Sequence, residues 1–210
     1  MTMNNSKALI VTSHVDASEK IEIKDSDFDC VICADGGLMR AVELGVRADV
    51  LIGDYDSMKQ PENADVIKLP TEKDMTDSEA AIDLAVSRGF ADITVIGGLG
   101  GRFDHAMGNI GMLAKYCGKL KRLAFVDGQN LVYMLPAGSY SIKALGYHYL
   151  SVTAYGGPVT GLTIKGVKYP LCGHLLTDDT TLGISNKIRG DEALVDFTGG
   201  RLLVMQTSDN

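Results

Sequence analysis

Four short segments of the sequence place carboxylates or glycines at spacings that suit metal and phosphate chemistry. They are Ala34-Asp35-Gly36-Gly37, Ile52-Gly53-Asp54-Tyr55-Asp56-Ser57, Lys73-Asp74-Met75-Thr76-Asp77 and Gly97-Gly98-Leu99-Gly100-Gly101-Arg102-Phe103-Asp104-His105. Each segment follows a short apolar run, so we expect all four at one edge of a parallel sheet, where open α/β sheets bind ligands. Carboxylates that converge there repel one another unless a cation lies between them, and hard oxygen ligands suit Mg²⁺.

Asp54 and Asp56 are the most specific of these acids, because two residues apart in an extended segment they point to the same side. The other acids also have structural interpretations. Asp35 could serve only as a turn former before two glycines. Asp77 could be an acid favoured by the dipole of a helix start, and Asp104 could cap a helix that begins at His105.

The segment from Gly97 to Arg102 indicates an anion-binding loop. It does not match the P-loop pattern, and it does not match the dinucleotide pattern because Phe103 stands where the third glycine is required. Its glycines let backbone N–H groups approach an anion, and Arg102 adds a planar fork suited to phosphate. Lys73 is either a mobile charge for a polyphosphate or a solvated surface lysine. His105 has either a chemical role or a packing role at the helix start.

The elements that must position these residues alternate in the first half of the chain. We expect strands at Ala8–Thr12, Cys30–Ala34, Val50–Ile52, Val66–Leu69, Ile93–Ile96 and Leu123–Val126, with helices after Gly37, Thr76 and Asp104. Thr76 and Glu79 have the spacing of a capping box, and Gly89 suits the end of that helix.

The second half of the chain has a different residue pattern. Short β-rich runs separated by turn residues occur at Leu131–Leu135, Tyr149–Tyr155, Gly161–Ile164, Ala193–Phe197 and Leu202–Gln206. The sequence therefore predicts a Rossmann-like α/β domain with a mostly parallel sheet at residues 1–127, followed by an all-β sandwich or small barrel at residues 128–210.

Composition limits the function classes. The 210 residues carry a formal charge of −7 and show no basic face, which argues against a nucleic-acid or anionic-membrane binder. No apolar stretch has the roughly 20 residues that a bilayer span requires, so we expect a cytoplasmic protein. Cys30 and Cys33 lie three apart in a predicted strand and point to opposite faces, so we interpret them as packing residues.

In this order and spacing, the four segments resemble thiamine pyrophosphokinase. The likeness extends into the β-rich half, where Gly183-Ile184-Ser185-Asn186 is similar to the family's G-x-S-N segment and Gly199-Gly200-Arg201-Leu202-Leu203-Val204 to its closing strand. The resemblance implies a reaction of ATP with thiamine that gives AMP and thiamine diphosphate. It also implies a homodimer in which each thiamine site combines one subunit's cleft with the partner's β domain.

The resemblance also implies roles for single residues. The Mg²⁺ ligands would be Asp35, Asp54, Asp56 and Asp77, with Asp74 as a further candidate. The triphosphate would be held by Lys73, Gly98, Gly100, Gly101, Arg102 and His105, and thiamine by Ser185 and Asn186. The catalytic set would be Asp54, Asp56, Asp77, Arg102 and Asp104, with Asp56 or Asp104 as the first places to look for a general base.

The sequence has no tryptophan to place beside the thiamine rings. Tyr169 or Tyr155 could take that place, or both could be ordinary half-buried tyrosines of the β domain. Two other functions share these motifs: a related pyrophosphokinase that acts on a pterin-type alcohol, and a non-catalytic protein that binds nucleotide and metal. The pocket around Ser185 and Asn186 would distinguish a thiamine enzyme from one that acts on a pterin. Release of AMP would distinguish an enzyme from a non-catalytic binding protein.

Overall fold

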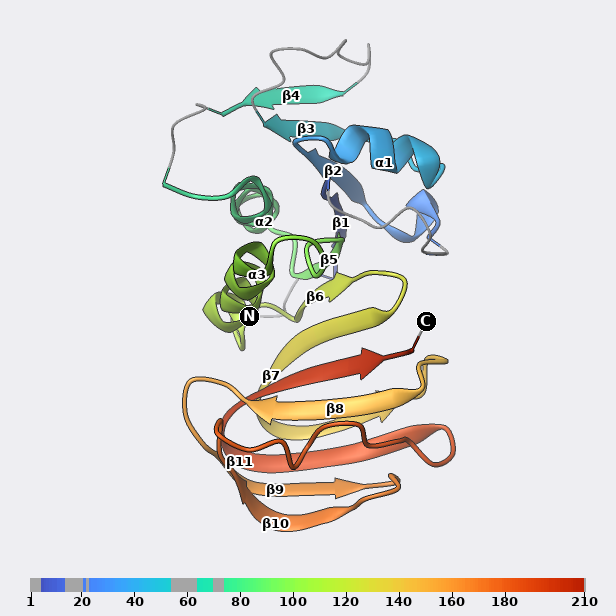
Figure 1. The fold of residues 1–210 in the computed structure, drawn as a ribbon. Helices are drawn as coiled ribbons and strands as arrows, with labels where there is room; N and C mark the ends of the chain where they lie inside the picture. Colours follow the sequence, from blue (N-terminus) through green and yellow to red (C-terminus); the bar gives the residue numbers. More distant parts are fainter. Residues whose placement is uncertain (1–4, 14–20, 22, 54–63, 70–73, 210) are drawn as a thin grey trace. The chain divides into compact units, whose positions relative to one another are not determined.

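The computed structural model describes residues 5–13, 21, 23–53, 64–69 and 74–209 (Figure 1). Contacts divide the chain into two compact units. The first comprises Met1–Met112 with Leu120–Gly128, and the second comprises Leu113–Lys119 with Gln129–Asn210.

The first unit is built on a parallel sheet with the strand order β6-β5-β1-β2-β3-β4. Its strands are β1 (Lys7–Val11), β2 (Cys30–Ala34), β3 (Val50–Gly53), β4 (Asp65–Lys68), β5 (Asp92–Ile96) and β6 (Arg122–Val126). Each lies within one or two residues of a predicted strand. The residues of β2 and β3 are all buried, as expected for continuous apolar runs in a parallel sheet.

Helices α1 (Gly37–Glu43) and α2 (Asp77–Ser87) and a short 3₁₀ turn, η1 (Asp25–Asp27), belong to this unit. Helix α3 (Phe103–Tyr116) begins in it, and its residues from Leu113 on belong to the second unit. The predicted capping box of α2 is confirmed on its N-cap side, because the Thr76 hydroxyl accepts the Glu79 N–H at 3.2 Å. Gly89, at φ +87°, follows the end of α2 as predicted. The prediction that a helix begins at His105 is wrong, since α3 begins at Phe103.

The second unit is an antiparallel assembly centred on β11. Its strands are β7 (Asn130–Lys143), β8 (Tyr149–Ala154), β9 (Val159–Lys165), β10 (Leu171–Leu176) and β11 (Glu192–Thr207). Strand β7 pairs with β11 along nearly its whole length, β9 pairs with the first part of β11, and β8 pairs with the last part. Fully buried side chains such as Phe197, Leu162 and Leu150 form the core of this unit.

Three features of the second unit differ from the sequence prediction. Strand β7 continues to Lys143, well beyond the predicted end at Leu135. The two strands expected at Ala193–Phe197 and Leu202–Gln206 are one strand, β11, with a register shift between Phe197 and Arg201. Strand β10 was not predicted at all. Four of its six residues are exposed, so it lacks the alternating apolar pattern that indicates a strand.

Cys30 and Cys33 are both buried in β2 and form no disulfide, in agreement with their interpretation as packing residues. Both thiols are buried, and this burial raises the pKa of Cys33 to about 12. Within the described ranges, no helix combines the length and the apolar character needed to cross a bilayer. The cytoplasmic location stays a prediction.

Candidate functional site

The carboxyl-terminal ends of the parallel strands are tied to one another by backbone hydrogen bonds. The N–H of Asp35, just after β2, donates to Ile52 O at 2.9 Å on β3. Thr12, just after β1, donates to Ile96 O on β5 both from its N–H at 3.1 Å and from its buried hydroxyl at 3.0 Å. These bonds hold together the carboxyl-terminal edge of the sheet, where the candidate residues follow the strands.

Two of the four predicted metal ligands lie in the described residues. Asp35 is exposed directly after β2, and Asp77 is the first residue of α2 and is half-buried. Asp74, the further candidate, is exposed just before α2. Asp54 and Asp56 lie outside the described residues. Among those that are described, no group of three or more His, Cys, Asp or Glu side chains could hold a metal.

The glycine loop after β5 has a fixed base and an open tip. Gly98 adopts φ +79°, and a Cβ atom there would lie 2.5 Å from the Asn109 Nδ2 atom. That same Nδ2 atom donates to Gly98 O at 2.8 Å from a buried position on α3. Gly101 also has a positive φ, of +74°, whereas Gly100 is exposed with no atom within 4 Å of its ideal Cβ. The loop therefore holds its backbone firmly and leaves room at Gly100.

Arg102 and Asp104 form an exposed bidentate ion pair at the start of α3. The Arg102 guanidinium donates to the Asp104 carboxylate from Nε at 3.1 Å and from Nη2 at 2.5 Å, and 74% of the arginine side chain is exposed. The bond from Arg102 lowers the pKa of Asp104, and the bond to Asp104 raises the pKa of Arg102. Asp104 also accepts the N–H of His105 at 2.9 Å, and His105 is itself exposed. Lys73 lies outside the described residues.

Ser185 and Asn186 occupy contrasting environments in the second unit. Ser185 is exposed, with φ +60°, and its N–H donates to the Ser151 hydroxyl at 2.9 Å. Asn186 is buried, and its carboxamide bonds to both backbone groups of Tyr169. Ser185 therefore offers a free surface to a ligand, whereas Asn186 faces the chain itself.

Backbone strain marks one predicted site residue in each unit. Among the described non-glycine residues, positive φ angles occur at Asp35 (+49°) and Ser185 (+60°) and nowhere else. Such conformations cost roughly 1–3 kcal/mol and persist where the surrounding structure enforces them, which happens most often at ligand sites. For Asp35 the positive φ fits a turn former as well as a ligand site, because aspartate tolerates the left-handed region.

Sequence reasoning missed the roles of Asn109 and Thr12. The sequence did contain a signal for Asn109, because it lies three residues after Ala106 and four before Leu113 on the apolar face of α3. A polar side chain at such a position needs an internal partner, and that partner is Gly98 O. The Thr12 hydroxyl gave no comparable signal, since its partner on β5 is distant in sequence.

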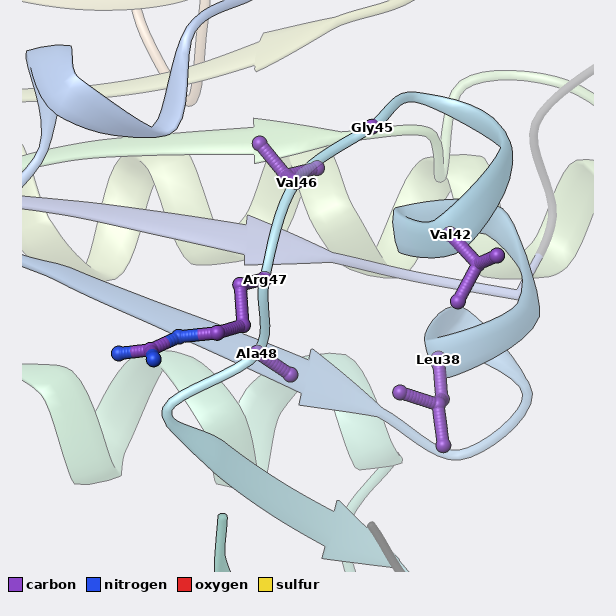
Figure 2. Close-up of a pocket in the computed structure, with 6 residues that line it drawn as sticks. All are labelled: Leu38, Val42, Gly45, Val46, Arg47 and Ala48. Atoms are coloured by element: carbon purple, nitrogen blue, oxygen red, sulfur yellow. The ribbon is translucent and has the colours of Figure 1, made fainter. Parts of the chain in front are cut away.

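A pocket of about 340 Å³ lies elsewhere in the first unit (Figure 2). Leu38 and Val42 on α1 and the segment from Gly45 to Ala48 line it, with the Arg47 guanidinium extending away from the two apolar side chains. None of the predicted site residues lines this pocket, so it is not the predicted site.

The two halves of the chain match two family models. Residues 24–125 match the model described as thiamin pyrophosphokinase, catalytic domain, and residues 139–202 match the model described as thiamin pyrophosphokinase, vitamin B1 binding domain. The two matches follow the same division into an α/β half and a β-rich half that the structure shows.

Individual proteins give the same result. The chain is 31% identical over 186 residues to thiamine pyrophosphokinase of Bacillus subtilis, covering 85% of this chain and 87% of that protein. A thiamin pyrophosphokinase structure from Geobacillus thermodenitrificans superimposes with a TM-score of 0.84 at 30% identity, over 97% of this chain and 98% of that one. A thiamin pyrophosphokinase family protein from Enterococcus faecalis gives 0.87 at 27% identity, over 98% and 100%. The resemblance seen in the sequence is confirmed, and the chain belongs to the thiamine pyrophosphokinase family.

Proposed function

We propose that this protein transfers the pyrophosphoryl group of ATP to thiamine. The thiamine hydroxyl oxygen bonds to the β-phosphorus of ATP, and the bond from that phosphorus to the oxygen bridging to the α-phosphorus breaks. The products are thiamine diphosphate and AMP, and the hydroxyl proton leaves with a base. The observation that carries this proposal is the match of both halves of the chain, in order, to the catalytic and vitamin B1 binding models.

The first half, residues 1–127, is the Rossmann-like ATP domain in this proposal. Its parallel sheet brings Asp35 to the carboxyl-terminal edge, where open α/β sheets bind ligands. Asp35 and Asp77 supply carboxylate oxygens, the ligand type that Mg²⁺ prefers, and Asp54 and Asp56 complete the set. When bound there, Mg²⁺ neutralises phosphate charge and helps to hold the triphosphate in line with the acceptor.

Arg102 and the glycine loop bind the triphosphate. The loop is open at Gly100, so phosphate oxygens can approach its backbone N–H groups. Arg102 is exposed and already held in a fork geometry by Asp104. A phosphate oxygen can replace the carboxylate as its partner, and the guanidinium then complements the charge that develops during transfer.

The second half, residues 128–210, is the β-sandwich or barrel that binds thiamine. Ser185 offers an exposed hydroxyl on a strained turn. Tyr169 is hydrogen-bonded to Asn186, the residue after Ser185. Its surface is 58% exposed, and its aromatic ring suits the cationic ligand. Tyr155 is less suitable because it is half-buried. Both rings have a cation nearby, since the Arg201 guanidinium lies 5.7 Å from the Tyr155 centroid and Lys168 Nζ lies 4.9 Å from the Tyr169 centroid.

A product assay tests the reaction. Purified protein is incubated with ATP, Mg²⁺ and thiamine, and AMP is separated from ADP and thiamine diphosphate from the monophosphate. We expect equal amounts of AMP and thiamine diphosphate, and loss of both when the metal is chelated. Formation of ADP and thiamine monophosphate would show transfer of the γ-phosphoryl group instead, and would contradict the proposed reaction. AMP released only with a pterin alcohol would favour the other pyrophosphokinase, and ATP binding without AMP would favour a non-catalytic protein.

The homodimer with shared sites forms part of the same proposal and has its own test. Asp54→Asn inactivates the ATP half of a site, and Ser185→Ala impairs its thiamine half. If each site combines the halves of two subunits, mixed dimers of the two variants contain one intact site. An equal mixture, exchanged by mild denaturation and refolding, should then recover about a quarter of the native activity at low thiamine. Activity no higher than the average of the two separate variants would show that each subunit builds its own site.

A further inference from the structure

We propose that Asn186 is a positioning residue, which fixes the backbone of Tyr169 so that the tyrosine ring is presented to thiamine. The inference rests on the proposed function and refines it. It separates the two residues of the Ser185-Asn186 pair, which the family resemblance assigns together to the thiamine pocket. Ser185 faces outward, and Asn186 acts through its neighbour.

The hydrogen bonds of Asn186 are used within the chain. Its Nδ2 atom donates to Tyr169 O at 2.7 Å, and its Oδ1 atom accepts the N–H of Tyr169 at 2.9 Å. Oδ1 also accepts the N–H of Lys187 at 2.9 Å. A carboxamide oxygen has two lone pairs, so both are occupied. A direct contact from Oδ1 to a substrate would require one of these bonds to break in a residue that is only 9% exposed.

Tyr169 needs such a partner because no strand supplies one. It lies between the isolated β-bridge of Val167 with Ile188 and the start of β10 at Leu171. Pro170 follows it and has no N–H to donate. The Asn186 side chain pairs with both backbone groups of Tyr169, as the backbone of a neighbouring strand would.

The rest of the local backbone holds Asn186 in place. Its own carbonyl accepts the N–H of Leu150 at 2.9 Å, within the isolated bridge between these two residues. The N–H of Lys168 donates to Lys187 O at 2.8 Å on the other side of the carboxamide. Asn186 is therefore anchored, and it holds the backbone from which the exposed Tyr169 ring projects; Lys168 Nζ contacts that ring at 4.9 Å from its centroid.

The absence of tryptophan from the sequence gives a direct test that does not depend on activity. Tyr169→Trp introduces a single indole, whose fluorescence anisotropy and quenching by acrylamide report how firmly this position is held. Adding Asn186→Ala should lower the anisotropy and increase the quenching. Thr163→Val is the matched control, because it removes a side-chain bond to the Gly173 N–H (3.0 Å) between β9 and β10 and should change neither signal.

Kinetics on otherwise native protein provide the second readout. Asn186→Ala should raise the KM for thiamine about tenfold while the KM for ATP stays within about twofold. In a Tyr169→Ala background the same substitution should change the thiamine KM by less than about twofold, because the ring through which it acts is gone. Asn186→Asp keeps an acceptor for the Tyr169 N–H but loses the donor to Tyr169 O. Its thiamine KM should therefore lie between those of the native protein and Asn186→Ala.

The outcomes distinguish failure of this inference from failure of the proposed function. Unchanged indole anisotropy, with additive effects of the two substitutions on the thiamine KM, would show that Asn186 contacts thiamine directly. If the native protein makes no thiamine diphosphate, the proposed function fails, and the fluorescence arm still decides whether Asn186 fixes Tyr169. If circular dichroism shows that Asn186→Ala does not fold, Asn186→Asp carries both readouts.

Discussion

Gly98 and Gly100 lie two residues apart in the same loop, yet we expect alanine substitutions there to have different effects on stability. Gly98→Ala should destabilise the protein, because Gly98 has φ +79° and its new Cβ would lie 2.5 Å from the Asn109 Nδ2 atom. Gly100→Ala should leave stability unchanged, because no atom lies within 4 Å of its Cβ position and its φ is not in the left-handed region.

The size of the Gly98 effect follows from two costs. A non-glycine residue in the left-handed region costs about 1–2 kcal/mol. Relief of the clash requires the Asn109 side chain to move away from Gly98 O, which breaks a bond of 2.8 Å in the interior. A buried polar group left without a partner costs about 1–3 kcal/mol. We expect Gly98→Ala to lower the free energy of unfolding by about 3 kcal/mol.

Urea unfolding followed by circular dichroism measures the difference. With a slope of about 2 kcal/mol per molar urea, Gly98→Ala should lower the midpoint by about 1.5 M. Gly100→Ala should stay within about 0.5 kcal/mol of the native protein. Its new methyl group stands where phosphate approaches in the proposed site, so its KM for ATP should rise.

Two results would refute this reasoning. If Gly98→Ala kept the native midpoint, the loop would not need a left-handed residue at that position or the bond to Asn109. If Gly100→Ala kept the native KM for ATP, the phosphates would not approach the loop at its open tip. The two substitutions serve as controls for each other, since each adds the same methyl group to the same loop.

Four further outcomes are expected. Arg102→Ala should lower kcat by about 10²–10³-fold with an unchanged urea midpoint, because in the proposed reaction the guanidinium stabilises the transferred phosphate and its pair with Asp104 is exposed. Since the Arg102 bond lowers the pKa of Asp104, this carboxylate should stay ionised as pH falls through the usual aspartate range; an NMR titration should show its pKa rising in Arg102→Ala. Asp54→Asn should abolish product formation at saturating Mg²⁺ while the circular dichroism spectrum is unchanged. With a thiol reagent, exposed Cys172 should react in native protein, and Cys33, whose pKa burial raises to about 12, only after unfolding.

The first unit was largely predictable because its signals are local. The apolar run Cys30–Ala34 became β2 with the predicted bounds, and Thr76 caps α2 through a bond to a residue only three positions away. Short spacing and side-chain chemistry determine such features, so they can be recognised without knowledge of the tertiary structure.

The strand β11 shows why the second unit was harder to predict. Thr198, Gly199 and Gly200 look like a turn between two strands, but they form an irregularity within one continuous strand. Gly200 has φ +91°, and a Cβ atom there would lie 2.4 Å from Pro158 O. The glycine permits a close approach by a segment about forty residues away, and nothing in the adjacent sequence distinguishes that requirement from a turn.

The candidate site shows the same division between local and tertiary information. The motifs predict Asp35 and Ser185 as site residues, and these are the non-glycine residues with positive φ in the described structure. They do not identify how each residue acts. The motif predicts Asn186 as a thiamine contact, whereas its hydrogen bonds to the Tyr169 backbone favour the positioning role proposed above. A role of this kind depends on a partner seventeen residues away, so it can be inferred only once the fold has brought the two together.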